Sequence, residues 1–220
     1  PGFVEQYGFE KDVDYVELKT YPPYEEGIPP KLLRLGERIK ERSNVRILKF
    51  KSRKELLARA DEVLELLDEE YKELYGVVPL SPKQIKYYVK KYFPFVNKDL
   101  VKIAVNENDE VVGFLITMPS LSHGMQKAKG RLLPFGWYHI LKGMKNMKIL
   151  DFYLAGIKKK YQGQGVDLLM VLEIVDICMN KKIDWAESTP ELESNTKIQA
   201  QWKYFNPVHH KRRRIYKKSI

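Results

Sequence analysis

The chain has 220 residues, of which 44% are hydrophobic and 12% aromatic, a composition that excludes a disordered protein and allows one substantial core. Its only cysteine, Cys178, excludes a disulfide framework and a cysteine-based metal site, and the histidines show no metal-ligand spacing, so we expect no metal. The net charge of +10 favours anionic partners, and no apolar stretch has the length of a membrane span, so we expect a cytoplasmic protein.

The spacing of apolar residues, prolines and glycines predicts strands and helices in alternation. In chain order these are a strand at 12–20, a proline-rich linker at 21–30, a helix at 30–42, a strand at 45–51, a long helix capped by Ser52 and ending near Gly76, a helix from Ser81-Pro82 to before Pro94, a hairpin at 100–118, an insertion at 119–148, a strand at 149–157, a helix from 166, a strand at 183–189, a helix at 191–205 and a strand at 211–219.

The insertion at 119–148 is basic and aromatic. No Asp or Glu lies between Glu110 and Asp151, whereas six Lys and Arg residues do. We expect a helical lid whose lysines face water; a helix packed permanently on the sheet is the alternative. The side chains expected to face inward are Phe135, Trp137, Ile140, Leu141 and Met144.

Residues 158–166 read KKKYQGQGV and join a β-type stretch to an apolar helix. A glycine-rich turn before a helix leaves backbone N–H groups without partners, and these attract a phosphate together with the helix dipole. A Rossmann fingerprint would need glycine where Leu168 stands, and a P-loop would need Gly-Lys-Ser or Gly-Lys-Thr at the helix start. The loop therefore predicts a phosphate cradle of another kind, with a tight turn and solvated lysines as the alternative.

The element order over residues 45–220 resembles that of the GNAT superfamily of acyl-CoA N-acyltransferases. The family signature is Arg or Gln, two residues, Gly, one residue, then Gly or Ala, and Lys160 to Gly165 match it with Lys in the first place. The resemblance implies a mixed α+β fold with a splayed central sheet, acetyl-CoA or another acyl-CoA as co-substrate, and an amine as acceptor.

The resemblance also implies a set of CoA-binding residues. The loop would hold the pyrophosphate through backbone N–H groups, one of Lys158, Lys159 and Lys160 would pair with phosphate, and the edge of the preceding strand would pair with pantetheine, where Gly156 suits a bulge. Asn195 matches an Asn that touches the pantetheine arm, or it is an ordinary polar helix residue. The full set is Leu154, Ala155, Gly156, Ile157, Lys158, Lys160, Tyr161, Gln162, Gly163, Gln164, Gly165, Val166 and Asn195.

The groups that handle protons are less well matched to the family. Glu187, on the strand beside the expected splay, is the candidate general base, or else a strand-end carboxylate that binds a lysine. The family commonly has a Tyr seven residues after the Asn as general acid, but Trp202 stands there and cannot donate a transferable proton. Tyr204 is the nearest tyrosine and the remaining candidate for the acid.

A second resemblance lies at the start of the chain. EQYGFEK followed by DYVEL, in residues 5–18, is similar to the closing segment of the family, and WKYFNPVHHKRRRIYKK is the same segment at the other end. Residues 1–43 are therefore expected to be the tail of a preceding, degenerate GNAT-like repeat plus a linker, and 44–220 the GNAT-like domain; an ordinary edge strand is the alternative. Because Pro1 stands where Met would, we also expect a longer polypeptide.

These features leave three functions open. The first is CoA-dependent N-acyl transfer to a small amine or amino-acid-like acceptor, and the second is long-chain acyl transfer, which the apolar insertion favours. The third is a non-catalytic acyl-CoA-binding or sensor domain, which Trp202 favours. We do not expect nucleic acid as a partner, because side chains that alternate on an exposed strand also explain KRRRIYKK. A transient contact with a membrane surface is compatible with the composition.

Overall fold

A computed structural model describes residues 1–92 and 96–219, and their contacts divide the chain into two compact units. The first unit consists of residues 1–23, 119–151 and 182–220, and the second of residues 24–118 and 152–181. Each unit thus combines segments that are distant in the sequence. The helix end expected before Pro94 lies outside the described residues.

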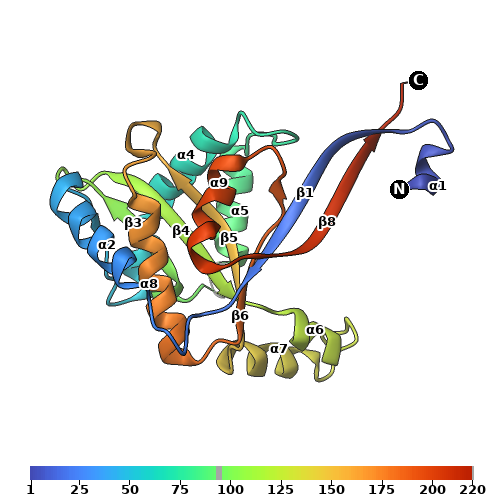
Figure 1. Cartoon of the computed structure of the whole chain (residues 1–220). Helices are drawn as coiled ribbons and strands as arrows, with labels where there is room; N and C mark the ends of the chain where they lie inside the picture. The colour runs from blue at the N-terminus through green and yellow to red at the C-terminus, as the bar shows by residue number, and fades with distance from the viewer. Residues whose placement is uncertain (93–95, 220) are drawn as a thin grey trace. The chain divides into compact units, whose positions relative to one another are not determined.

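The second unit contains four neighbouring strands in the order β2-β3-β4-β5, with helices around them (Figure 1). The strands β3 and β4 form the predicted antiparallel hairpin, in which Ile103 is opposite Phe114. The bounds are α2 (Pro30–Ser43), β2 (Arg46–Ile47), α3 (Arg53–Leu57), α4 (Ala60–Tyr71), α5 (Pro82–Tyr92), η2 (Lys98–Leu100), β3 (Val101–Val105), β4 (Val111–Pro119), β5 (Ile149–Ile157, of which the part from Phe152 belongs here), η3 (Lys159–Tyr161) and α8 (Val166–Lys181).

Strand β3 is buried on both faces because helices cover both. On one face Leu56, Val63 and Leu66 from α3 and α4 form a core with Val101, Ile103, Val105, Val111 and Phe114. On the other face Lys102 is buried and pairs with Glu173 of α8 at 3.1 Å. Burying a charge is unfavourable without such a partner, so this ion pair specifies how α8 lies on the hairpin.

Two expectations for the second unit need correction. The strand expected at 45–51 has only two residues, although the Leu48 N–H still donates to the Ile103 carbonyl at 2.8 Å. The long helix is two helices, α3 and α4, separated between Leu57 and Ala60. The Ser52 cap is confirmed, because its side chain accepts from the Glu55 N–H at 3.2 Å.

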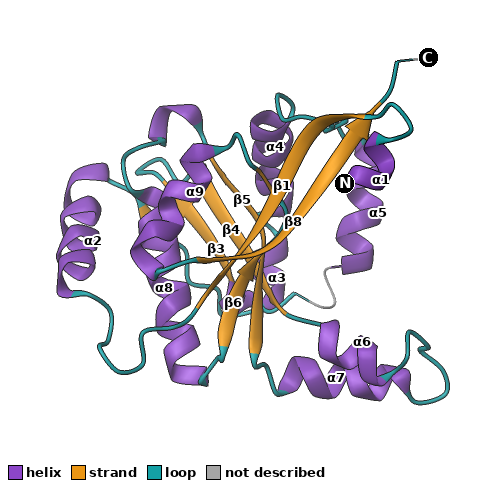
Figure 2. Cartoon of the chain, turned by 45° about the vertical axis from the view of Figure 1, so that its right-hand side comes forward, coloured by secondary structure: helices purple, strands orange, loops and turns teal. Residues whose placement is uncertain are grey.

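The first unit is built around strand β1, which pairs with β8 along one edge and with β6 and β7 along the other (Figure 2). All three pairings are antiparallel, and the one with β8 runs from Glu10–Lys217 to Lys19–Val208. The bounds are α1 (Gly2–Glu5), β1 (Glu10–Thr20), α6 (Ser122–Lys127), α7 (Gly136–Lys145), β6 (Trp185–Ser188), β7 (Glu191–Leu192), α9 (Thr196–Trp202), η4 (Lys203–Phe205) and β8 (Val208–Lys217).

The helix expected at 191–205 begins later than predicted. Glu191 and Leu192 form β7, because β1 supplies a strand partner there: Leu192 is opposite Tyr15 and Glu191 is opposite Val16. The helix α9 follows from Thr196.

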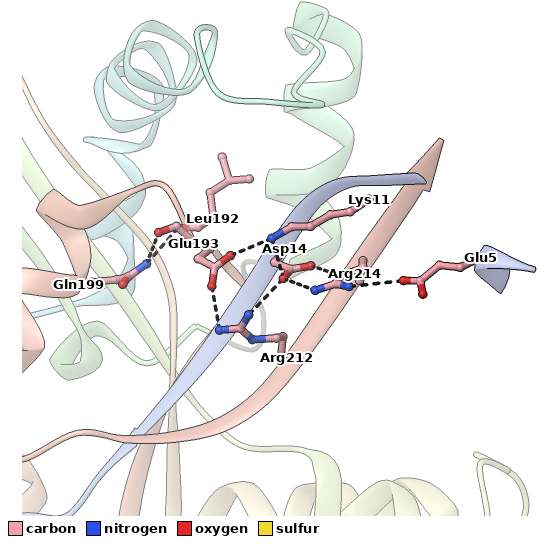
Figure 3. A network of polar contacts seen from close by, with 8 residues as sticks. All are labelled: Glu5, Lys11, Asp14, Leu192, Glu193, Gln199, Arg212 and Arg214. Carbon is pink, nitrogen blue, oxygen red and sulfur yellow. Dashed lines mark hydrogen bonds and ion pairs between the residues drawn. The ribbon is translucent and has the colours of Figure 1, made fainter. Parts of the chain in front are cut away.

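Charged side chains join β1 to β8 (Figure 3). The fully buried carboxylate of Asp14 accepts from Arg214 Nε at 2.8 Å and from Arg212 at 3.1 Å, and Lys11 Nζ lies at 3.0 Å. The hydrogen bonds from Arg214 hold the pKa of Asp14 well below its usual range. Much of the basic run in β8 therefore has acidic partners inside the fold.

In residues 1–92 and 96–219, no helix combines the length and the apolar character needed to cross a bilayer.

Candidate functional site

The glycine loop of the second unit leads from β5 through η3 into α8. Gly163 has φ +75° and Gly165 has φ +82°, a region that glycine enters at no steric cost. Within the described residues, no backbone carbonyl accepts a hydrogen bond from the N–H groups of Gly163, Gly165, Val166 or Asp167. These donors stand at the positive end of the sixteen-residue helix α8, as an anion site requires.

The two glycines differ in their surroundings. A Cβ on Gly163 would meet no heavy atom within 4 Å, so this position borders open space. A Cβ on Gly165 would lie 2.4 Å from Cδ1 of Ile39 in α2, so this glycine is needed for packing as well as for its φ angle. A substitution at Gly163 is therefore a cleaner test of ligand binding than one at Gly165.

Hydrogen bonds within the unit fix the side chains around the loop. Gln162 Nε2 donates to Glu70 at 2.8 Å and to the Ile157 carbonyl at 3.0 Å, and Gln164 Nε2 donates to the Lys160 carbonyl at 2.6 Å. Burial raises the pKa of Glu70. The loop backbone is thus held from several sides before any ligand binds.

The three lysines before the loop have different roles. Lys159 pairs with Glu73 at 3.2 Å on the surface. In the part of the chain that the structure describes, neither Lys158 nor Lys160 forms an ion pair with a carboxylate. Lys158 and Lys160 are therefore the lysines with charge to offer to a phosphate.

The expected pantetheine edge of β5 has a partner that the sequence did not suggest. The Lys158 N–H donates to the Val112 carbonyl at 2.9 Å, so this end of β5 lies beside β4. There the Tyr71 hydroxyl of α4 donates to the Ala155 carbonyl at 3.1 Å, and the Ala155 N–H lies 3.4 Å from the same hydroxyl. One side chain thus satisfies both backbone groups that a ligand would need.

Packing explains Gly156, for which the sequence suggested a bulge. A Cβ at this position would lie 2.7 Å from Cε1 of Phe114, whose ring is fully buried. The absence of a side chain lets β5 cross the face of that ring closely.

The candidate base Glu187 lies on β6 in the first unit. Its carboxylate accepts from Trp185 Nε1 at 2.7 Å and from Lys211 at 3.2 Å, and His210 lies at 3.6 Å. Burial alone would raise the pKa of Glu187, but the hydrogen bonds from Trp185 and Lys211 together lower it. Glu187 thus has the lysine partner that the alternative interpretation required, and it remains ionised at neutral pH.

A second carboxylate of the first unit, Asp151, was not suggested by the sequence. Burial raises the pKa of Asp151, a hydrogen bond from Ser120 opposes that rise, and the charge of Glu187 adds to it. A carboxylate whose pKa is raised accepts a proton better than one whose pKa is lowered. No motif marks Asp151, because its environment comes from residues far away in the sequence.

The remaining candidates of the first unit surround α9. Asn195 caps this helix, its side chain accepting from the Ile198 N–H at 3.4 Å. Trp202 is buried and donates from Nε1 to Glu191 at 2.9 Å, while Tyr204 is exposed. Burial raises the pKa of Glu191 to about 7, a second titrating group that the sequence did not reveal.

The structure thus brings together residues 154–166 in the second unit. Glu187, Asn195 and Tyr204 lie in the first unit. Among the described residues, no group of acidic, histidine and cysteine side chains could hold a metal ion.

The fold is that of the GNAT superfamily, the GCN5-related N-acetyltransferases. A tandem GNAT protein of the clavulanic acid biosynthesis pathway matches with a TM-score of 0.55 at 10% identity, over 98% of this chain and 56% of that one. Other solved GCN5-related N-acetyltransferases match similarly. At these identities the likeness shows the fold alone.

Two curated proteins are similar in sequence, although no family model matches. Protein YghO of Escherichia coli is 22% identical over 223 residues, which cover 99% of this chain and 56% of that protein. The bacterial ceramide synthase of Caulobacter vibrioides is 26% identical over 165 residues, 71% of this chain and 42% of that protein. The chain thus spans about half the length of the curated relatives it matches.

Proposed function

We propose that the chain is an acyl-CoA-dependent N-acyltransferase. The observation that carries the proposal is the loop before α8, beside Lys158 and Lys160. In this loop the N–H groups of Gly163, Gly165 and Val166 have no backbone acceptor among the described residues. Such a loop fits the pyrophosphate of CoA, and a GNAT fold suggests an acyl group as the cargo.

In the proposed reaction an amine nitrogen attacks the thioester carbonyl. A C–N bond forms, the C–S bond breaks, and the proton that the amine loses passes through a base and water to the departing CoA thiolate. An ammonium ion cannot attack, so the base must first take a proton from the acceptor. Glu187 and Asp151 are the candidate bases of the first unit, and a backbone N–H of β5 is the candidate to polarise the thioester oxygen.

We propose a fatty acyl group and a long-chain amino alcohol as the preferred substrates. A ceramide is an amide of these two components, and the chain is 26% identical to a bacterial ceramide synthase over 165 residues. The exposed apolar side chains of the insertion also suit amphiphilic substrates. Acetyl transfer to a small amine is the second candidate, and binding of acyl-CoA without turnover is the third.

The test is release of CoA thiol from acetyl-CoA and palmitoyl-CoA, each with a small amine and with a long-chain amino alcohol. We expect palmitoyl-CoA with the amino alcohol to react fastest. Thiol release only from acetyl-CoA would replace the long-chain proposal. Tight binding of acyl-CoA without thiol release from any substrate pair would show that the chain is a sensor domain and not an enzyme.

The same assay tests the base. We expect Glu187→Gln to lower turnover roughly a hundredfold at neutral pH, with CoA affinity unchanged and with a smaller loss at high pH, where the free amine is abundant. Asp151→Asn is the matched variant. A parental rate in Glu187→Gln together with a loss in Asp151→Asn would move the base to Asp151.

We also propose that the chain is the C-terminal part of a tandem GNAT-like protein in the cytoplasm. The solved tandem GNAT protein matches over 56% of its length, and both curated relatives are about twice as long as the matched region. Residues 1–43 would then be the tail of the preceding repeat and its linker. In the structure, residues 10–20 form β1 and pair with β8.

A further inference from the structure

The turn between α6 and α7 carries large apolar side chains that are strongly exposed. Leu132 is 60% exposed, Leu133 79% and Phe135 71%. Burial of such side chains is favourable, so three exposed together mark a surface that contacts something else. The prediction that Phe135, Trp137 and Leu141 face inward is wrong for the described structure, in which all three are exposed.

Hydrogen bonds hold this turn in place. The Gly130 N–H donates to the Met125 carbonyl at 3.1 Å, and the Trp137 N–H donates to the Leu132 carbonyl at 3.0 Å. The indole N–H of Trp137 donates to the Pro134 carbonyl at 2.9 Å. The apolar side chains are therefore presented outward by a defined backbone.

Helix α7 continues the same surface. Trp137, Tyr138 and Leu141 are exposed, whereas Ile140 and Met144 are partly buried. The two helices α6 and α7 lie against each other (Figure 2), and a Cβ on Gly124 would come within 2.9 Å of the Ile140 Cα. The hairpin thus uses one face of α7 for packing and leaves its aromatic face outside. Indole and phenol rings of this kind favour the boundary between water and lipid.

Basic residues flank the apolar turn on both sides along the chain. In the described structure none of the insertion's basic residues except Lys148 forms an ion pair, and all are exposed. No acidic residue occurs in the insertion. A second copy of this surface would bring basic groups against basic groups, whereas an anionic surface would neutralise them. The basic residues are Lys127, Lys129, Arg131, Lys142, Lys145 and Lys148.

We propose that the α6–α7 hairpin docks on an anionic lipid membrane, with Leu132, Leu133 and Phe135 inserted among the headgroups. Lys and Arg side chains near an anionic leaflet add electrostatic attraction, and the apolar turn adds the burial of its side chains. The combination gives reversible attachment to a surface. The proposal is independent of the reaction, because it requires neither the glycine loop nor a bound acyl-CoA.

The test is co-sedimentation with vesicles of phosphatidylcholine alone and of phosphatidylcholine with 30% phosphatidylglycerol. We expect binding to the anionic vesicles that weakens in high salt and that the double variant Leu133→Ser with Phe135→Ser lowers at least tenfold. Both side chains are exposed, so the variant should fold, and an unchanged melting temperature and unchanged CoA affinity check this. The matched control replaces two equally exposed apolar residues elsewhere, Val78 at 79% and Phe3 at 74%, by Ser.

The outcomes are distinct. The double variant Leu133→Ser with Phe135→Ser is called the tip variant. Loss of vesicle binding in the tip variant but not in the control supports the proposal. Equal binding to both kinds of vesicle, equal binding by the tip variant, or no binding by the parent would overturn it. So would a concentration-dependent dimer, measured by sedimentation equilibrium, that the tip variant dissociates. Release of CoA thiol from acetyl-CoA in the presence of a water-soluble amine, measured in parallel, reports on the proposed reaction separately.

Discussion

Glu191 is a partly buried carboxyl group that contacts Trp202. Trp202 stands where the GNAT resemblance implies a tyrosine acid, and its indole donates to Glu191 Oε1 at 2.9 Å. For the pKa of Glu191, the rise caused by burial exceeds the lowering by hydrogen bonds from Trp202 and Ser188. Burial raises the pKa of Glu191 to about 7, so the group gains and loses a proton in the range where an acid or base is useful.

We predict that Glu191 makes the protein less stable as pH rises. Its folded pKa is above the unfolded value, so its contribution is fully present below about pH 4.5 and is lost as pH rises through about 7. The shift corresponds to about 2–3 kcal/mol between pH 5 and pH 8. Urea unfolding at both values should show this fall in the parent and a smaller one in Glu191→Gln. Glu193→Gln is the control, and a fall of equal size in both variants would contradict the prediction.

A substitution at Tyr71 tests how acyl-CoA binds at the edge of β5. Its hydroxyl satisfies the N–H and carbonyl groups of Ala155, so a pantetheine arm that pairs with Ala155 must displace it. Tyr71→Phe removes the competing group, and we expect acyl-CoA to bind about twofold to fivefold more tightly, since one such hydrogen bond is worth about 0.5–1 kcal/mol. Calorimetric titration measures this, with Tyr87→Phe on α5 as the control. Weaker binding would show instead that the hydroxyl contacts the ligand.

In the proposed function, the backbone of the loop before α8 binds the pyrophosphate of CoA. A β-branched side chain at Gly163 would enter open space at this loop, whose N–H groups at Gly163, Gly165 and Val166 have no backbone acceptor within the described residues. We predict that Gly163→Val weakens CoA binding at least tenfold, about 1.4 kcal/mol. Equilibrium dialysis with CoA measures the affinity.

The control for the loop must separate binding from backbone strain, because φ is positive at Gly163. Gly76 has φ +73° and open space around it, far from the loop in the sequence, so Gly76→Val carries similar strain. If a folded Gly163→Val protein binds CoA with unchanged affinity, the proposal that this loop binds the CoA pyrophosphate is wrong. Gly165→Val is a poorer probe, since its side chain would clash with Ile39.

The pairing of β1 with β8 explains the basic run near the end of the chain. Arg212 and Arg214 bind Asp14, and Lys211 and Arg213 bind Glu17 at 3.1 and 2.7 Å. The basic run thus has acidic partners on β1 and helps to hold the two strands together.

Across the whole molecule, the elements predicted correctly are those that depend on residues close together in the sequence. The helix at Pro30, the Ser52 cap, the β3–β4 hairpin and the strand, loop and helix at 149–181 all lie where their sequence patterns place them. These patterns are periodicity, capping and turn chemistry, which act between near neighbours.

The wrong predictions concern residues whose contacts are with residues distant in the sequence. Leu192 was expected in a helix, but pairing with Tyr15 makes it a strand. The faces of α7 were assigned wrongly because apolar residues occur on both sides, and periodicity alone does not say which side packs on α6. Tyr71, Asp151 and Glu191 belong to no motif, so only the folded chain reveals their contacts.

The β1–β8 ribbon has a consequence for synthesis of the chain. Asp14 and Arg214 are 200 residues apart, so the ribosome makes one strand of the ribbon long before its partner. Until β8 is translated, one edge of β1 has unpaired backbone groups, which are prone to join the wrong strand. The second unit is complete once residue 181 has been made, whereas the first unit must wait for the last strand. We therefore expect β1 to be exposed to wrong pairing during most of the time that the ribosome spends on these residues.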